Sequence, residues 1–89
     1  MTIYYTTQFK KDYKRIKKQN KELSKLKFII DKLVDGDQLE PKHRDHQLTG
    51  ELKGYRDCHI EPDWLLIYKR TSDILILERT GSHSELFKK

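Results

Sequence analysis

The sequence predicts a small α+β fold in the order β-α-α-β-β-β, with two N-terminal helices packed on an antiparallel sheet and a short C-terminal helical turn. Three observations lead to this prediction. Helical spacing of apolar residues is confined to residues 7–34, short apolar runs follow between residues 55 and 77, and turn signals separate those runs. Because 89 residues supply one modest core, we expect a single domain over residues 1–89.

The first strand is predicted over residues 3–5, which are β-branched and aromatic. No short connection ties this run to the later strands, so its place in the sheet stays open. Thr6 and Thr7 are candidate N-caps for a first helix, because their hydroxyls can accept from free backbone amides. That helix is supported by one apolar stripe of helical spacing, made of Phe9, Tyr13 and Ile16.

A second helix is predicted after Asn20, which breaks the first helix or caps the next. Gly36 marks its end, because glycine readily adopts the left-handed conformation that closes a helix. A second apolar stripe with helical spacing supports this helix, and it contains Leu23, Leu26, Ile30, Leu33 and Val34. The two stripes together imply antiparallel helices joined by a tight link.

The second half of the chain predicts a strand meander. Residues 37–50 form the longest loop, because they are mostly polar and include proline and glycine. Turn signals at residues 61–63 and 71–73 separate the strands that follow, and Gly81 ends the last one, which leaves residues 82–87 for a helical turn. Neighbouring strands joined by short turns pair antiparallel, and the helices can cover one face. The predicted strands are residues 55–60, 64–68 and 74–77.

Positive charge is concentrated in the first part of the chain. Residues 1–32 hold ten Lys and Arg against three Asp and Glu, whereas residues 33–89 hold nine against eleven. This asymmetry indicates a polyanion or an acidic protein partner, and equally fits a solvated lysine-rich face. No apolar run approaches the roughly 18 residues that span a bilayer, the first residues lack the pattern of a secretion signal, and Cys58 is the only cysteine. We therefore expect a cytoplasmic protein with no membrane contact.

All four histidines follow residue 42. His59 lies near the end of a predicted strand, Asp63 across the next turn and His83 after the last strand, so a meander can bring them to one rim. Histidines are also frequent as ordinary surface or capping residues, so spacing alone leaves both interpretations open. RNA cleavage by the 2′-hydroxyl needs a base, an acid and positive charge at the phosphate, without a metal. Histidine suits both proton roles, because its unperturbed pKa is near 6.5.

Zinc binding is the rival chemistry for a histidine set. His43 and His46 stand at i and i+3, a spacing that could suit two ligands, but there is no CxxC motif, and Cys58 alternates to the opposite side of its strand from His59. We therefore predict no metal and no cofactor. Several aromatic residues could stack on unpaired bases, among which Tyr68 fits the core best and Phe87 fits it least; the set is Tyr55, Trp64, Tyr68 and Phe87.

Several motifs of the second half resemble the YafQ subfamily of RelE-like toxins, in the RelE/ParE superfamily, and the resemblance covers nearly the whole chain. They are specific in combination. The motifs are residues 45–50 (DHQLTG), 53–64 (KGYRDCHIEPDW), 66–68 (LIY), 78–83 (ERTGSH) and 86–87 (LF).

The resemblance implies a RelE-like, microbial-ribonuclease-like fold and a type II toxin that cuts mRNA, typically in the ribosomal A site. It also implies a cognate antitoxin that binds and neutralises the toxin. By motif, the residues that correspond to the active site of the family are His46, His59, Asp63, His83 and Phe87. His83 is the favoured proton-transfer residue and His46 or His59 its partner, with the acid and base roles undivided.

Further residues of the same motifs are expected to help. Arg79 matches an arginine that stabilises the phosphate or the transition state, and Trp64 matches a residue beside the active site. Lys53 and Arg56, two cations of the longest motif, are further candidate substrate contacts. His43 lies outside the pattern, so we expect it on the surface.

Two other functions stay open from the sequence. ParE-like relatives inhibit a protein target such as gyrase, but they generally lack this set of histidines. A non-catalytic RNA-binding module would bind RNA with a strong dependence on salt and would release no product.

Overall fold

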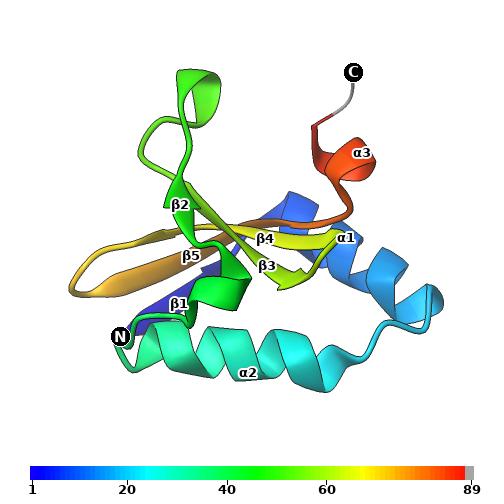
Figure 1. Cartoon of the computed structure of the whole chain (residues 1–89), viewed down its shortest axis with the longest axis horizontal. Helices are drawn as coiled ribbons and strands as arrows, with labels where there is room; N and C mark the ends of the chain where they lie inside the picture. The colour runs from blue at the N-terminus through cyan, green and yellow to red at the C-terminus, as the bar shows by residue number, and fades with distance from the viewer. Residues whose placement is uncertain (88–89) are drawn as a thin grey trace.

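The computed structural model describes residues 1–87, which form a five-stranded sheet, two long helices and one short helix (Figure 1). None of the helices in that range is long and apolar enough to cross a membrane. The elements are β1 (Thr2–Tyr5), α1 (Thr7–Lys18), α2 (Leu23–Val34), η1 (Pro41–His43), β2 (His46–Gln47), η2 (Gly50–Leu52), β3 (Arg56–Glu61), β4 (Trp64–Arg70), β5 (Ile74–Gly81) and α3 (His83–Leu86), where η marks a 3-10 helix.

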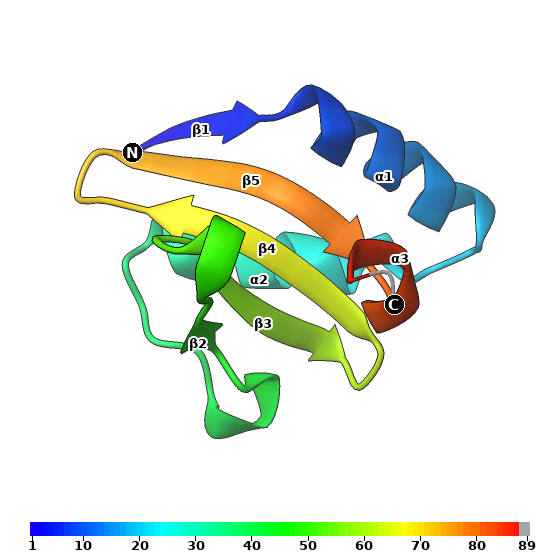
Figure 2. The same ribbon diagram turned by 90° about the horizontal axis from the view of Figure 1, so that it is seen from above.

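The strand order in the sheet is β1-β5-β4-β3-β2 (Figure 2). Strands β3, β4 and β5 form the predicted antiparallel meander. β1 pairs parallel with β5, from Thr2 opposite Ile74 to Tyr5 opposite Leu77, so the sheet is mixed rather than purely antiparallel. A parallel pair requires a long crossover, and here the chain from α1 to β4 provides it.

The local signals for the two helices are confirmed. The Thr6 hydroxyl accepts from the backbone amide of Phe9 at 2.9 Å and caps α1. Asn20 has a φ of 58° and separates the helices, which fits its tolerance of the left-handed region. The strand β2 was not predicted, because it is only two residues long and lies inside the polar 37–50 segment.

The hydrophobic core lies between the helix pair and one face of the sheet, with α2 running behind the strands in Figure 2. Side chains of β4 alternate between the two faces, so Trp64, Leu66 and Tyr68 join this core. Leu65 and Ile67 point the other way and are buried as well. The β2 segment and α3 rise on that second side, away from α2 (Figure 1). β4 is therefore the buried centre of the sheet, as its apolar sequence predicts.

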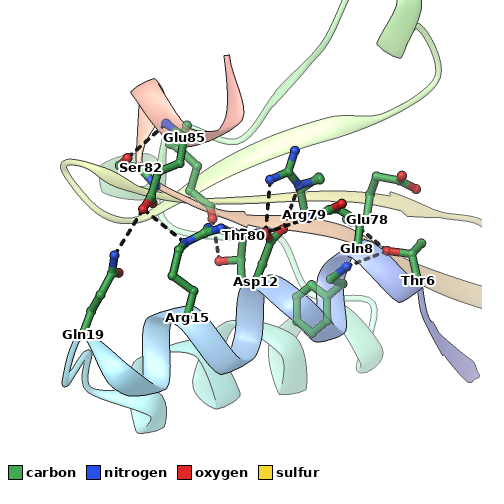
Figure 3. Close-up of polar contacts among 12 residues, drawn as sticks. Thr6, Gln8, Asp12, Arg15, Gln19, Glu78, Arg79, Thr80, Ser82 and Glu85 are labelled. Atoms are coloured by element: carbon green, nitrogen blue, oxygen red, sulfur yellow. Dashed lines mark hydrogen bonds and ion pairs between the residues drawn. The ribbon is translucent and has the colours of Figure 1, made fainter. Parts of the chain in front are cut away.

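The buried stripe of α1 differs from the predicted one at a single position. Phe9 and Ile16 are buried as expected, but Tyr13 is 37% exposed and Asp12 is fully buried in its place. The Asp12 carboxylate accepts from Nε and Nη2 of Arg79 at 2.7 and 3.1 Å (Figure 3). It also accepts from the Thr80 backbone amide at 3.2 Å and from Arg15 Nη1 at 2.9 Å. This helix is thus fixed to β5 by a polar contact inside an apolar surface.

Burial alone would raise the pKa of Asp12, since a low-dielectric surrounding disfavours the charged form. The hydrogen bonds from Arg79, Thr80 and Gln8 outweigh that effect, so the pKa is lowered. Asp12 therefore remains ionised and paired in the folded protein.

Arg15 extends the same network to α3. Its Nη2 donates to the Thr80 carbonyl at 2.8 Å, and its Nε lies 3.1 Å from the Glu85 carboxylate. Glu85 in turn accepts from the Ser82 amide at 2.8 Å, while the Ser82 hydroxyl caps the start of α3 (Figure 3). A Cβ on Gly81 would meet the ends of the Arg15 and Glu85 side chains, so a larger residue there would have to displace them from this network.

Removing the Asp12 carboxylate should destabilise the fold strongly. Asp12→Ala leaves Arg79 and Arg15 without their shared anion, and breaking a buried ion pair costs about 3–5 kcal/mol. We expect that loss in the free energy of unfolding measured by urea titration. The matched control is Asp31→Ala, because the Lys27–Asp31 pair is largely exposed, and exposed helical pairs are worth only about 0.3–0.5 kcal/mol.

The stabilisation by Asp12 should also depend on pH. A folded-state pKa below the unfolded value of about 3.9 gives stability that is present above that value and is lost as the pH falls through the lower folded value. The unfolding free energies of the parent and of Asp12→Asn should therefore converge in acid. A constant difference across the acid range would contradict this assignment of the charge.

Candidate active site

The polar site lies on the face of the sheet opposite to α2. Two rows of paired residues cross it from β3 to β5. One row is Asp57, Ile67 and Arg79, and the other is His59, Leu65 and Gly81. Paired residues of neighbouring strands point to the same face, so Asp57 and His59 stand on one side of an apolar floor and Arg79 on the other. At about 4.8 Å per strand, the two sides are roughly 10 Å apart.

His83 and Asp63 form the closest pair of the site. His83 is the first residue of α3, and Asp63 lies in the turn between β3 and β4. One oxygen, Asp63 Oδ1, accepts from the His83 backbone amide at 2.9 Å and lies 2.7 Å from His83 Nδ1. The backbone hydrogen bond, followed by the imidazole contact, lowers the pKa of Asp63. An ionised Asp63 therefore holds the proton on Nδ1, which leaves Nε2 of His83 free for a substrate.

His59 completes the rim that the sequence predicts. Its ring lies 5.4 Å from the His83 ring, centroid to centroid, in an edge-to-face arrangement. Its Nδ1 lies 3.3 Å from the Pro62 carbonyl, a weak contact at the same turn. The structure thus brings His59, Asp63 and His83 together, as expected from their positions at the ends of the strands.

His46 reaches the site from β2. It pairs with Asp57 across the β2–β3 ladder, and its Nδ1 lies 2.7 Å from the Arg44 carbonyl and 3.0 Å from Asp57 Oδ1. Only the Arg44 contact has hydrogen-bond geometry, so the approach to Asp57 is an electrostatic one. The backbone of Arg44 therefore orients the ring of His46.

Asp57 is the site residue that sequence reasoning missed. Its side chain is only 6% exposed, and Oδ1 has no hydrogen-bond partner within residues 1–87. Burial raises the pKa of Asp57, while the nearby His46, His59 and His83 partly oppose that shift. A buried, unsatisfied carboxylate facing three imidazoles is a typical feature of a functional site. Its position two residues before His59, on the same face of one strand, was the available signal.

Arg79 faces the site with part of its guanidinium. Asp12 occupies Nε and Nη2, whereas Nη1 has no hydrogen-bond partner within residues 1–87. The side chain is 26% exposed. An arginine fixed on one side and free on the other is arranged to bind an anion with little loss of side-chain entropy.

The structure places two of the expected substrate contacts on the helix-facing side of the sheet. Trp64 is fully buried on the helix-facing side and donates from Nε1 to the Thr80 hydroxyl at 2.9 Å, so its ring cannot stack on a base. Arg56 alternates to that same side, where its Nε lies 3.3 Å from the Asp45 carboxylate. Trp64 instead supports the strand segment beside Arg79.

His43 is buried rather than on the surface, which corrects the expectation from the sequence. Its Nδ1 lies 2.7 Å from the His59 carbonyl, so it ties the 41–44 loop to β3. Cys58 is buried on the core side, opposite to His59, and burial raises the pKa of its thiol. Tyr68 is buried in the core and donates its hydroxyl proton to Asp45 at 2.6 Å.

Phe87 and Lys53, two further candidates from the sequence, lie at the end of α3 and in the segment before β3. Phe87 follows α3 and is half-buried, with its amide donating to the His83 carbonyl at 2.8 Å. Lys53 is exposed and lies between η2 and β3, in the segment that rises beside β2 in Figure 1. Within residues 1–87, no three His, Cys, Asp or Glu side chains are grouped as metal ligands are.

Comparisons with known proteins show the same fold and a closely similar sequence. The curated mRNA interferase toxin YafQ of Escherichia coli is 46% identical over 86 residues, which cover 96% of this chain and 94% of that protein. The crystal structure of YafQ from E. coli matches with a TM-score of 0.92 at 45% identity over 96% of both chains. In the crystal structure of the E. coli DinJ–YafQ complex, the matched chain has a TM-score of 0.90 at 46% identity, again over 96% of both chains. A family model described as the bacterial toxin of type II toxin–antitoxin systems, YafQ, matches residues 1–88, and the chain therefore belongs to the YafQ family of toxins.

Proposed function

We propose that this toxin is an endoribonuclease that cuts mRNA through attack by a ribose 2′-hydroxyl. The observation that carries the proposal is the His83–Asp63 pair, with His59 against it and Arg79 across the same face. The name of the E. coli relative, mRNA interferase toxin, describes the same class of reaction.

The reaction needs two proton transfers. A base removes the proton of the 2′-hydroxyl, whose oxygen then attacks the adjacent phosphorus, and an acid protonates the 5′-oxygen as the P–O5′ bond breaks. The products are a 2′,3′-cyclic phosphate and a 5′-hydroxyl. In our proposal His83 performs one transfer through Nε2, while Asp63 holds Nδ1 and stabilises the imidazolium. His46 or His59 performs the other.

Arg79 is the proposed anion stabiliser. Negative charge grows on the phosphate oxygens as the 2′-oxygen attacks, and a prearranged guanidinium in a partly buried site stabilises that charge strongly. Asp12 prevents the arginine from reorienting, since it binds two of its three nitrogens. Because imidazoles and a guanidinium supply all the charge and the protons, the proposed reaction requires no metal.

Other contacts follow from the same proposal. The half-buried Phe87 is a candidate platform for a base, and the exposed Lys53 a candidate phosphate contact. E. coli YafQ forms a complex with DinJ, and we propose that a cognate antitoxin binds this chain in the same way. The lysine-rich α1 and α2 suit ribosomal RNA or an acidic antitoxin segment. We propose that the toxin acts on mRNA at the ribosome, in the cytoplasm.

The purified protein should cleave single-stranded RNA in the presence of EDTA. His83→Ala should slow that cleavage by about 10²–10⁴-fold, the range for loss of a general acid or base. Gel analysis of end-labelled RNA measures both effects, and circular dichroism checks the fold. Ser84→Ala, the next residue of α3, is the control and should cut like the parent. Equal activity of His83→Ala and the parent would rule out the assigned chemistry.

Asp57→Asn should stabilise the fold and reduce the activity. Because the folded-state pKa of Asp57 is raised, its ionisation opposes folding. The penalty is absent below the unfolded pKa, grows as the pH rises from the unfolded to the folded value, and is complete above the folded value. At neutral pH the variant should melt about 4–8 °C higher for each kcal/mol of penalty that it removes. Cleavage should fall, because the variant removes the negative charge that faces His46, His59 and His83.

The control for this variant is Asp73→Asn, an exposed aspartate in the turn between β4 and β5. It should change neither the melting temperature nor the cleavage rate. A fall in melting temperature for Asp57→Asn, measured above the pKa of an ordinary carboxylate, would show that the charge of Asp57 supports the fold instead.

A further inference from the structure

A groove of about 760 Å³ opens directly from the histidine site and is not used by the proposed chemistry. It lies between the first half of α2, the 41–44 loop and the end of β3, and both His59 and His83 are among its lining residues. This volume lies within the range of ligand-binding clefts, about 300–1,000 Å³. A polymeric ligand that passes through the active site therefore has a continuous path along this groove.

One wall of the groove carries free positive charge. Lys42 and Arg44 are exposed there, and neither forms an ion pair with any residue in the described part of the chain. Lys25, on the α2 side, is bound by Glu61 at 2.7 Å, so it neutralises the carboxylate in the groove. The remaining charge on the walls is positive, which favours an anionic chain.

The opposite wall carries an exposed aromatic ring. Phe28 projects from α2 with 52% of its surface exposed, and Ile29 beside it is buried in the core. Beside the groove, Lys32 Nζ lies 5.6 Å from the centroid of the Phe28 ring and 3.9 Å from the Asp37 carboxylate. A flat ring beside cations is the combination by which proteins hold unpaired bases and their phosphates.

The charged wall is positioned by strained backbone. Arg44 has a φ of 47°, a conformation that an L-residue with a side chain rarely adopts. His43 anchors the loop to the His59 carbonyl, and the Arg44 carbonyl lies against His46 Nδ1. The 41–44 loop thus fixes the groove cations relative to two of the imidazoles, which is consistent with strain retained for a function.

We propose that this groove binds the nucleotides that flank the scissile phosphate of a single-stranded RNA, with a base stacked on Phe28 and phosphates held by Lys42 and Arg44. The inference rests on the proposed ribonuclease function and extends it to a subsite on one side of the cut. It predicts that kcat/KM for cleavage rises with the length of RNA on that side and stops rising once the groove is filled.

The test uses RNA oligonucleotides that share one cleavage site and carry flanks of increasing length on the 5′ or the 3′ side. For the parent, kcat/KM should increase with flank length on one side. Phe28→Ala should reduce kcat/KM by about 5- to 150-fold on long substrates, the factor for one stacked base, and cut the shortest substrate at the parental rate. Phe28→Tyr should retain the rise of kcat/KM with flank length. Tyr4→Ala, which removes an equally exposed aromatic from β1, should change nothing.

The charge contribution is tested with Arg44→Gly, because glycine accepts the positive φ and leaves the loop backbone unstrained. The variant should lower the salt dependence of binding by about 0.7 for each phosphate that the groove no longer neutralises, measured with oligonucleotides that carry a 2′-deoxy group at the cleavage site. These substrate analogues report binding even if the parent cuts no RNA. The binding experiment can therefore contradict the subsite without contradicting the proposed cleavage reaction, and the cleavage experiment can contradict the reaction without contradicting the subsite.

The subsite would be overturned if Phe28→Ala lowered kcat/KM equally on short and long substrates, or if it did not lower kcat/KM on any substrate. A Phe28→Ala variant that binds and cuts every RNA normally but loses affinity for its antitoxin would assign the groove to a protein segment and would also overturn it.

Discussion

The contact between buried Asp12 and Arg79 is the constraint on which the rest of the structure depends. An ionised carboxylate inside the core is tolerated only because two arginines and a backbone amide surround it. The same oxygens join α1 to β5, orient Arg79 toward the histidine face and, through Arg15, reach α3. Replacing Asp12 with an apolar residue could preserve the fold, but it would remove the contact that positions the Arg79 guanidinium.

The alternation of side chains along the strands separates stability from chemistry. On β3, Cys58 and Ile60 face the helices, whereas Asp57 and His59 face the opposite side. The side of the sheet that carries His59 also contains groups whose burial or conformation opposes folding. They include the unsatisfied carboxylate of Asp57 and, in the adjoining loop, Arg44 with its positive φ. The helix face holds most of the apolar core that offsets those costs.

Local patterns were sufficient to predict the helices, the meander and the rim formed by His59, Asp63 and His83. They failed where a position depends on a partner distant in the sequence. Asp12 looks like a surface residue of a charged helix, because its partner Arg79 is 67 residues away. His43 looks exposed for the same reason, since the carbonyl that it contacts belongs to β3. Trp64 matches a motif beside the active site, but the period of two along β4 turns its ring into the core.

The short helix α3 has one further consequence. It is a single turn, held to the sheet by the contact of Glu85 with Arg15 and by its own capping box, whereas the central strand β4 is buried over residues 64–68. Segments with few apolar contacts open locally at far lower free energy than the whole domain. His83 therefore has the local stability of that turn, so fraying of one helical turn is enough to separate His83 from Asp63 while the remaining fold stays intact.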